Sequence, residues 1–144
     1  MGLRYNKIMP PSAGYREKAH TADWELEVWG PDLPALFEQA ALGMYAQAGV
    51  RLQPVPRIGH RLELEASDLE SLLVRFLEEL LYLQSMEALA FDTFELQFTE
   101  YGLQGELLGA PIASLDKDIK AVTYHKLKVR EGPNGLAVKI VFDV

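Results

Sequence analysis

The sequence predicts an α+β domain in which one mostly antiparallel sheet packs against two main helices, in the order β-α-β-α-β-β-β-β. Segments in which apolar and polar residues alternate predict the strands, and two segments with apolar residues at helical spacing predict the helices. Both helices lie early in the chain, whereas the later strands follow one another without an intervening helix. A doubly wound parallel sheet needs more crossover helices than this chain supplies.

The first strand and the first helix are expected in the opening third of the chain. Residues 24–29 alternate apolar residues with glutamates, which is typical of a half-buried strand. Asp32 is suited to cap the helix that follows, which carries an apolar stripe and ends at Gly49.

A second alternating strand is expected over residues 61–66, followed by the clearest helix in the chain. Ser67 and Glu70 stand at the spacing of a capping box. The predicted buried face of this helix consists of Leu69, Leu72, Leu73, Phe76, Leu77, Leu80 and Leu81.

The remaining strands are expected over residues 94–101, 104–108, 121–129 and 136–142. The last two join through a glycine-rich turn at 132–135. The charged segment at 116–120 lacks the glycine and the distal glutamate of an EF-hand, so it is interpreted as an exposed turn.

Length and composition fit one folded domain over residues 1–144, with residues 1–14 as an irregular lead-in. The chain is 49% hydrophobic and has no cysteine, which excludes disulfides, thiolate zinc sites and thiol nucleophiles. No apolar run is long enough to span a bilayer, and no signal core is present, so we expect a cytoplasmic protein.

The formal net charge of −7 argues against unaided binding to nucleic acid, because backbone phosphates are repelled overall. It does not exclude docking onto a basic protein that itself holds nucleic acid. The glycine-rich phosphate loops, the G-x-S-x-G elbow and the H-E-x-x-H zinc motif are all missing from the sequence.

Two aspartates mark the ends of predicted strands. Asp23 opens the first strand, and Asp143 closes the last one, next to Val144. If those strands are neighbours, their carboxylates and the terminal carboxylate of Val144 converge and repel one another unless a cation lies among them. Oxygen ligands alone suit a hard cation such as Ca²⁺. The spacing alone fits better two carboxylates that cap turns or pair with lysine.

Four segments in this order together resemble the archease family. They are His20-Thr21-Ala22-Asp23, residues 68–73 with 77–82, Lys120-Ala121-Val122-Thr123-Tyr124-His125, and Phe142-Asp143-Val144. The resemblance implies a protein that is not an enzyme but activates an RtcB-type RNA ligase in tRNA splicing and RNA repair. It implies that the protein promotes guanylylation and multiple turnover of the ligase.

The resemblance also implies a Ca²⁺ site, with Mg²⁺ and Mn²⁺ as alternative ions. The implied ligands are the side chains of Asp23 and Asp143, and main-chain or terminal carboxylate oxygens of Val144. His20 is expected to orient Asp23 or to lie just behind the ligands. Lys120 and His125 are expected either to touch the ligase or offset the carboxylates, or equally to have an ordinary strand role. RNA would be met only indirectly through the ligase, and no membrane is involved.

Two other function classes remain open at the sequence level. One is a metal-dependent phosphoester hydrolase in which His20 is the general base. The other is a chaperone-like scaffold protein with an apolar surface patch around Trp29 or Tyr45.

Overall fold

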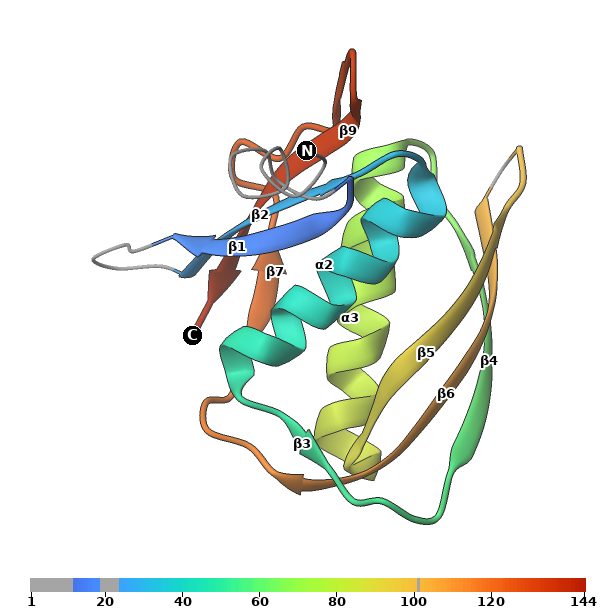
Figure 1. The fold of residues 1–144 in the computed structure, drawn as a ribbon, viewed down its shortest axis with the longest axis vertical. Helices are drawn as coiled ribbons and strands as arrows, with labels where there is room; N and C mark the ends of the chain where they lie inside the picture. The colour runs from blue at the N-terminus through green and yellow to red at the C-terminus, as the bar shows by residue number, and fades with distance from the viewer. Residues whose placement is uncertain (1–11, 19–23, 101) are drawn as a thin grey trace, which may run out of the picture.

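The computed structural model describes residues 12–18, 24–100 and 102–144 and has the predicted α+β class (Figure 1). The described residues contain two helices, α2 (Leu33–Ala48) and α3 (Leu69–Glu87). Every strand pair is antiparallel, but the strands form two sheets instead of the single sheet that the sequence predicts. None of the described helices combines the length and the apolar character needed to cross a bilayer.

The first sheet is built around the last strand of the chain. Its members are β1 (Gly14–Lys18), β2 (Trp24–Gly30), β7 (Ala121–Thr123), β8 (Arg130–Gly132) and β9 (Gly135–Asp143). The strand order is β1-β2-β9-β7, and β8 pairs with the opening residues of β9. A long strand from one end of the chain therefore lies beside a strand from the other end.

The second sheet is built around one long strand. Its members are β3 (Arg51–Leu52), β4 (Ile58–Glu65), β5 (Leu89–Phe98) and β6 (Gly102–Ser114). All three other strands pair with β6.

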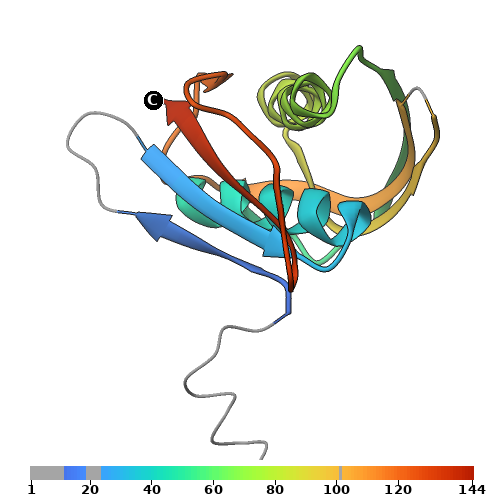
Figure 2. The ribbon, with the colours of Figure 1, turned by 90° about the horizontal axis from the view of Figure 1, so that it is seen from above.

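The helices lie between the two sheets and contact both of them (Figure 2). α2 packs on β1, β2 and β9 on one side and on β5 on the other, while α3 contacts β4, β5 and β6 as well as β7. This arrangement follows from the sequence of α2, because its buried residues occur at so many helical positions that one sheet cannot cover them. Those buried residues are Leu36, Phe37, Ala40, Ala41, Gly43, Met44, Tyr45 and Ala48.

Both ends of α2 are stabilised as the sequence predicts. The side chain of Asp32 accepts a hydrogen bond from the backbone N–H of Ala35 at 3.0 Å. At the other end Gly49 has a φ of 69°, the left-handed conformation that favours glycine after a helix.

The cap of α3 differs from the predicted capping box by one residue. The side chain of Asp68, not that of Ser67, accepts a hydrogen bond from the backbone N–H of Ser71 at 2.8 Å. Glu70 does not reach back to the cap; its carboxylate accepts a hydrogen bond from the backbone N–H of Val129 at 2.9 Å. Glu70 therefore ties α3 to the chain segment that leads into β8.

The strand pattern of the first sheet departs from prediction at two places. β1 covers residues for which no strand was expected and includes Gly14, the last residue of the expected lead-in; residues 1–11 lie outside the described part. The strand expected over 121–129 is wrong beyond its first three residues: β7 covers only 121–123, and β8 begins at Arg130, past the predicted end. A turn follows β7, in which Lys126 has a φ of 53° and Leu127 donates a backbone hydrogen bond to Tyr124.

In the second sheet the predicted strands are present but longer. β4 begins at Ile58, β5 begins at Leu89, and β6 runs to Ser114. The two-residue strand β3 was not predicted. Residues 116–120 lie outside helices and strands, but the segment is not wholly exposed as predicted, because Ile119 is buried in the core. The turn through 132–135 is present.

Candidate functional site

The strand pairing that the sequence-based hypothesis requires is present in the first sheet. β2 pairs along its whole length with residues 136–142 of β9, with Trp24 opposite Phe142 at one end. The start of β2 and the finish of β9 therefore lie at the same end of the sheet, where the C-terminus is drawn in Figure 1.

On its other side, the end of β9 is held by β7. Ala121 is the strand partner of Asp143, and the backbone N–H of Lys120 donates to the backbone carbonyl of Asp143 at 2.8 Å. Asp143 thus lies on the middle strand of three, between the opening residues of β2 and those of β7. Its backbone is fixed on this side, so its side-chain direction is set by the pleat.

The last three residues alternate in burial as a strand requires. Phe142 is fully buried, the side chain of Asp143 is exposed, and Val144 is half-buried and packs against the core. The buried Phe142 anchors the strand end, so the Asp143 carboxylate faces solvent from a rigid position. No basic side chain in the described part of the chain forms an ion pair with this carboxylate.

The donor atoms at this end of the sheet are of the type that a hard cation prefers. The Asp143 carboxylate and the main-chain oxygens of Val144 are oxygen ligands, which Ca²⁺ prefers. His20 and Asp23 lie outside the described residues. Within residues 12–18, 24–100 and 102–144, no three His, Cys, Asp or Glu side chains are grouped to hold a metal. A complete site at this end therefore needs donors in addition to Asp143 and Val144.

The two basic residues singled out in the sequence occupy different ends of β7. Lys120 is exposed and directly precedes the strand partner of Asp143. His125 is exposed beyond the other end of β7, where its backbone N–H donates to the Thr123 hydroxyl at 3.2 Å. The structure brings Lys120, but not His125, to the end that carries Asp143.

The surface patch suggested around Tyr45 is not present. Tyr45 is only 6% exposed and belongs to the core, and its burial raises the pKa of the phenol. Trp29 is half-buried on the first sheet. Any apolar docking surface must therefore be made by other residues than Tyr45.

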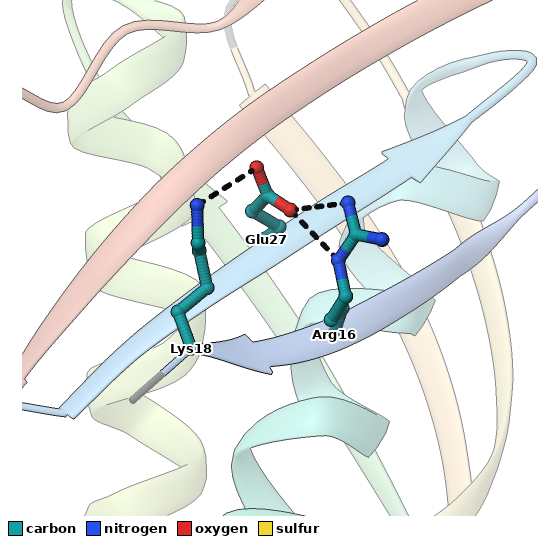
Figure 3. A network of polar contacts seen from close by, with 3 residues as sticks. All are labelled: Arg16, Lys18 and Glu27. Carbon is teal, nitrogen blue, oxygen red and sulfur yellow. Dashed lines mark hydrogen bonds and ion pairs between the residues drawn. The ribbon is translucent and has the colours of Figure 1, made fainter. Parts of the chain in front are cut away.

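Sequence reasoning missed a polar cluster on β1 and β2, because β1 itself was not predicted. Glu27 accepts hydrogen bonds from Arg16 Nε at 2.9 Å and Arg16 Nη2 at 2.6 Å, and Lys18 Nζ lies 3.8 Å from its other oxygen (Figure 3). The hydrogen bonds from Arg16 hold the pKa of Glu27 below its usual range, with Lys18 and Lys139 adding positive charge nearby. The only sequence signal for this cluster is the basic pattern of Arg16 and Lys18.

Two solved structures share this architecture of two helices between antiparallel sheets. The solution structure of protein 1598 from Methanobacterium thermoautotrophicum superposes with a TM-score of 0.69 at 24% identity, covering 91% of this chain and 99% of that chain. The crystal structure of an archease, described as a possible chaperone, from Thermotoga maritima has a TM-score of 0.66 at 21% identity, covering 90% and 94%. The class is therefore that of small α+β proteins with the archease fold.

Sequence comparison gives the family. The Archease protein family (MTH1598/TM1083) matches residues 15–144. The chain is 37% identical over 125 residues to the archease of Thermococcus kodakarensis, which spans 81% of this chain and 87% of that protein. It is 32% identical over 139 residues to the archease of Methanosarcina barkeri, spanning 90% and 95%. The chain belongs to the archease family.

Proposed function

We propose that this protein is a metal-binding activator of an RtcB-type RNA ligase, acting in tRNA splicing and RNA repair. It promotes guanylylation and multiple turnover of the ligase and is not itself an enzyme. The proposal is supported by membership of the archease family together with one observation, the pairing of β2 with β9 that brings the start of one to the acidic end of the other.

The metal ligands in this proposal are the side chains of Asp23 and Asp143 with oxygens of Val144. The described pairing supports the set because Trp24, directly after Asp23 in the chain, lies opposite Phe142, directly before Asp143. Oxygen donors favour Ca²⁺, with Mg²⁺ and Mn²⁺ as alternatives. Asp23, Asp143 and Val144 would hold this cation, which would neutralise their carboxylates and would supply positive charge at the ligase centre.

Charge is the second part of the proposal. A ligase active site that holds RNA and a nucleoside triphosphate has an electropositive mouth, and a partner of net charge −7 is steered toward it. The exposed Asp143 end of this protein docks at the opening of the ligase active site. Lys120, at the same end, contacts the ligase or offsets the carboxylates, and His20 orients Asp23. His125 is proposed as a partner contact only. We place this activity in the cytoplasm.

The decisive variants are Asp143→Asn and Asp23→Asn, with Asp118→Asn as the matched control. Asp118 is an exposed aspartate in the loop before β7 that is not among the proposed ligands, and Asp118→Asn makes the same charge change. We expect Ca²⁺ to raise the melting temperature of wild type and control, because an ion that binds only the folded state stabilises it. Neither site variant should show this rise, and neither should stimulate guanylylation of the ligase.

The two readouts separate the metal site from the ligase role. Retained Ca²⁺ stabilisation in both site variants would remove these aspartates from the metal site. Intact ligase stimulation in both would remove the metal from the mechanism. Turnover of phosphoesters by the protein and metal alone, without ligase, would replace the activator with a hydrolase.

A second candidate function is a chaperone-like role. One observation favours it, namely that the structurally similar protein of Thermotoga maritima is described as a possible chaperone. Apolar side chains available for such contacts include Tyr82, Met86 and Tyr124, each more than half exposed. Suppression of aggregation of an unfolded client that persists with chelator and in Asp143→Asn would support this role.

A further inference from the structure

A basic hollow lies on the face of the first sheet that points away from the helices. Leu26, Val28 and Val138 are buried toward the helices, so the residues between them on β2 and β9 face outward. The hollow encloses about 440 Å³. Its charged lining consists of Arg16, Lys126, Lys128, Arg130, Lys139 and Glu27.

The hollow concentrates positive charge in an acidic protein. Five of the fourteen Lys and Arg residues of the chain line it, against one carboxylate. That carboxylate, Glu27, is already neutralised by Arg16 and Lys18 (Figure 3). Within the described residues, none of the other four cations forms an ion pair. The local field is therefore positive although the chain as a whole is negative.

Sheet register and a half-buried loop bring these cations together. Arg16, Glu27 and Lys139 are partners across three adjacent strands. In residues 126–130 the three cations are exposed, whereas the alternate residues Leu127 and Val129 are half-buried and pack against the core. Lys126, Lys128 and Arg130 consequently project into the same hollow.

The indole of Trp29 forms an apolar part of the lining. The guanidinium carbon of Arg16 lies 5.8 Å from the centre of the ring, and the ring packs over Gly14, where a Cβ would come within 2.8 Å of it. A neighbouring hollow of about 630 Å³ shares Trp29 and Arg130. The basic hollow therefore adjoins further concave surface along the β8–β9 hairpin and is not an isolated pit.

We propose that this basic hollow binds the phosphates of single-stranded RNA. Several unpaired cations beside an aromatic side chain, on an extended concave surface, are typical of proteins that hold single strands. A run of phosphates complements cations that are spread over β9 and residues 126–130 better than one free phosphate can. An acidic peptide is less suited, because its carboxylates do not use the aromatic lining.

The proposal departs from the expectation that RNA is met only through the ligase, which was drawn from net charge. Phosphates within a Debye length, about 10 Å at 0.1 M salt, respond mainly to the nearest charges. The hollow also shares its face of β9 with Asp143, four residues beyond Lys139 and about 13 Å away at the usual rise of a strand. The inference itself does not rest on the ligase.

The test measures RNA binding by the protein alone. The probe is a fluorescein-labelled twelve-residue oligouridylate, followed by anisotropy at increasing salt. The test variant is Lys126→Gln/Lys128→Gln/Arg130→Gln. The control is Arg51→Gln/Arg61→Gln/Lys117→Gln, which removes the same charge from exposed positions outside the hollow.

We expect the test variant to lose at least tenfold in affinity and the control to stay within about twofold of wild type. The slope of log K against log salt should become shallower by about 2, since each phosphate contact on a single strand contributes about 0.7. Asp143→Asn should bind RNA like the wild type, so a failure of the metal proposal would leave this result intact.

Three outcomes would overturn the proposal. The wild type could show no salt-dependent binding, the test and control variants could lose affinity equally, or polyglutamate could compete as well as unlabelled RNA. The last result would assign the hollow to an acidic protein segment. Thermal unfolding of each variant is the control for folding, and we expect melting temperatures close to wild type because the substituted side chains are exposed.

Discussion

At the scale of single residues, Asp68 links the sequence to the stability of a helix. Its carboxylate accepts the Ser71 backbone N–H at the start of α3, and this hydrogen bond lowers the pKa of Asp68 from its ordinary value. A carboxyl group whose pKa is lower in the folded state stabilises the fold above its unfolded pKa, about 3.9. That contribution is lost as the pH falls through the lower, folded pKa.

Substitution of Asp68 should therefore change the acid end of the stability curve. Asp68→Asn keeps a good cap but removes the titration, so at pH 7 its free energy of unfolding should stay close to wild type. Between pH 4 and pH 2 it should lose less stability than wild type does. Urea unfolding at both pH values measures this, and Asp68→Ala, without a cap, should already be weaker at pH 7. Parallel losses in Asp68→Asn and wild type would contradict the assignment.

The position of Asp143 in its strand could be predicted from the sequence, but its neighbours on the sheet could not. The sequence predicts that Asp143 closes the last strand, and in the structure it is the last residue of β9 and is exposed. Its neighbours on β2 depend on pairing between residues more than a hundred positions apart in the chain. Only the resemblance to the archease family suggested that pairing in advance.

At the scale of elements, Gly43 sets the distance between α2 and the first sheet. A Cβ at this position would lie 2.7 Å from Leu26 Cδ2 and 2.8 Å from Tyr15 Cγ. Glycine in a helix interior normally costs about 1 kcal/mol relative to alanine. Here it allows the helix to approach β1 and β2 closely, so the usual preference is outweighed by packing.

Gly43→Ala should consequently destabilise the protein, although the same change in an open helix is stabilising. Overpacking of a tight interior costs about 1–3 kcal/mol, which exceeds the gain in helix propensity. Ala46→Gly, at an exposed site of the same helix, is the control and should cost about 1 kcal/mol. Urea denaturation measures both. A Gly43→Ala protein more stable than wild type would show that the helix is free to shift.

The strands were harder to predict than the helices for a physical reason. β2 and β4 alternate clearly because one face is buried, and both were predicted. β1 carries Arg16, Glu17 and Lys18, all exposed, and it is an edge strand that β2 holds by backbone hydrogen bonds. Such bonds leave no pattern of side chains in the sequence, so β1 and the basic hollow beside it were missed.

At the scale of the whole molecule, an aromatic cluster joins the helices to the second sheet. The ring of Phe37 on α2 lies 5.5 Å from Phe76 on α3 and 4.8 Å from Phe98 on β5, and Phe76 lies 6.3 Å from Phe94. Phe37 and Phe76 are fully buried. The cluster therefore holds together elements that no strand pairing connects.

Phe37→Ala should cost about 3–5 kcal/mol, a large part of the 5–15 kcal/mol that stabilises an ordinary domain. Phe37→Leu should cost less because it leaves a smaller cavity. Tyr82→Ala is the control, since Tyr82 is 56% exposed and its loss should cost no more than about 0.5 kcal/mol. Thermal and urea unfolding rank the three. Equal effects of Phe37→Ala and Tyr82→Ala would contradict a central role for the cluster.

The sequence by itself determined the α+β class, both helices and their apolar faces, and the family, because these depend on local periodicity and on short motifs. The tertiary structure alone decided that the strands divide into two sheets around the helices, that β2 meets β9, and that Arg16, Lys139 and residues 126–130 face one hollow. These features depend on backbone pairing and packing between segments that are distant in the chain. Local sequence patterns do not specify which strands will become neighbours.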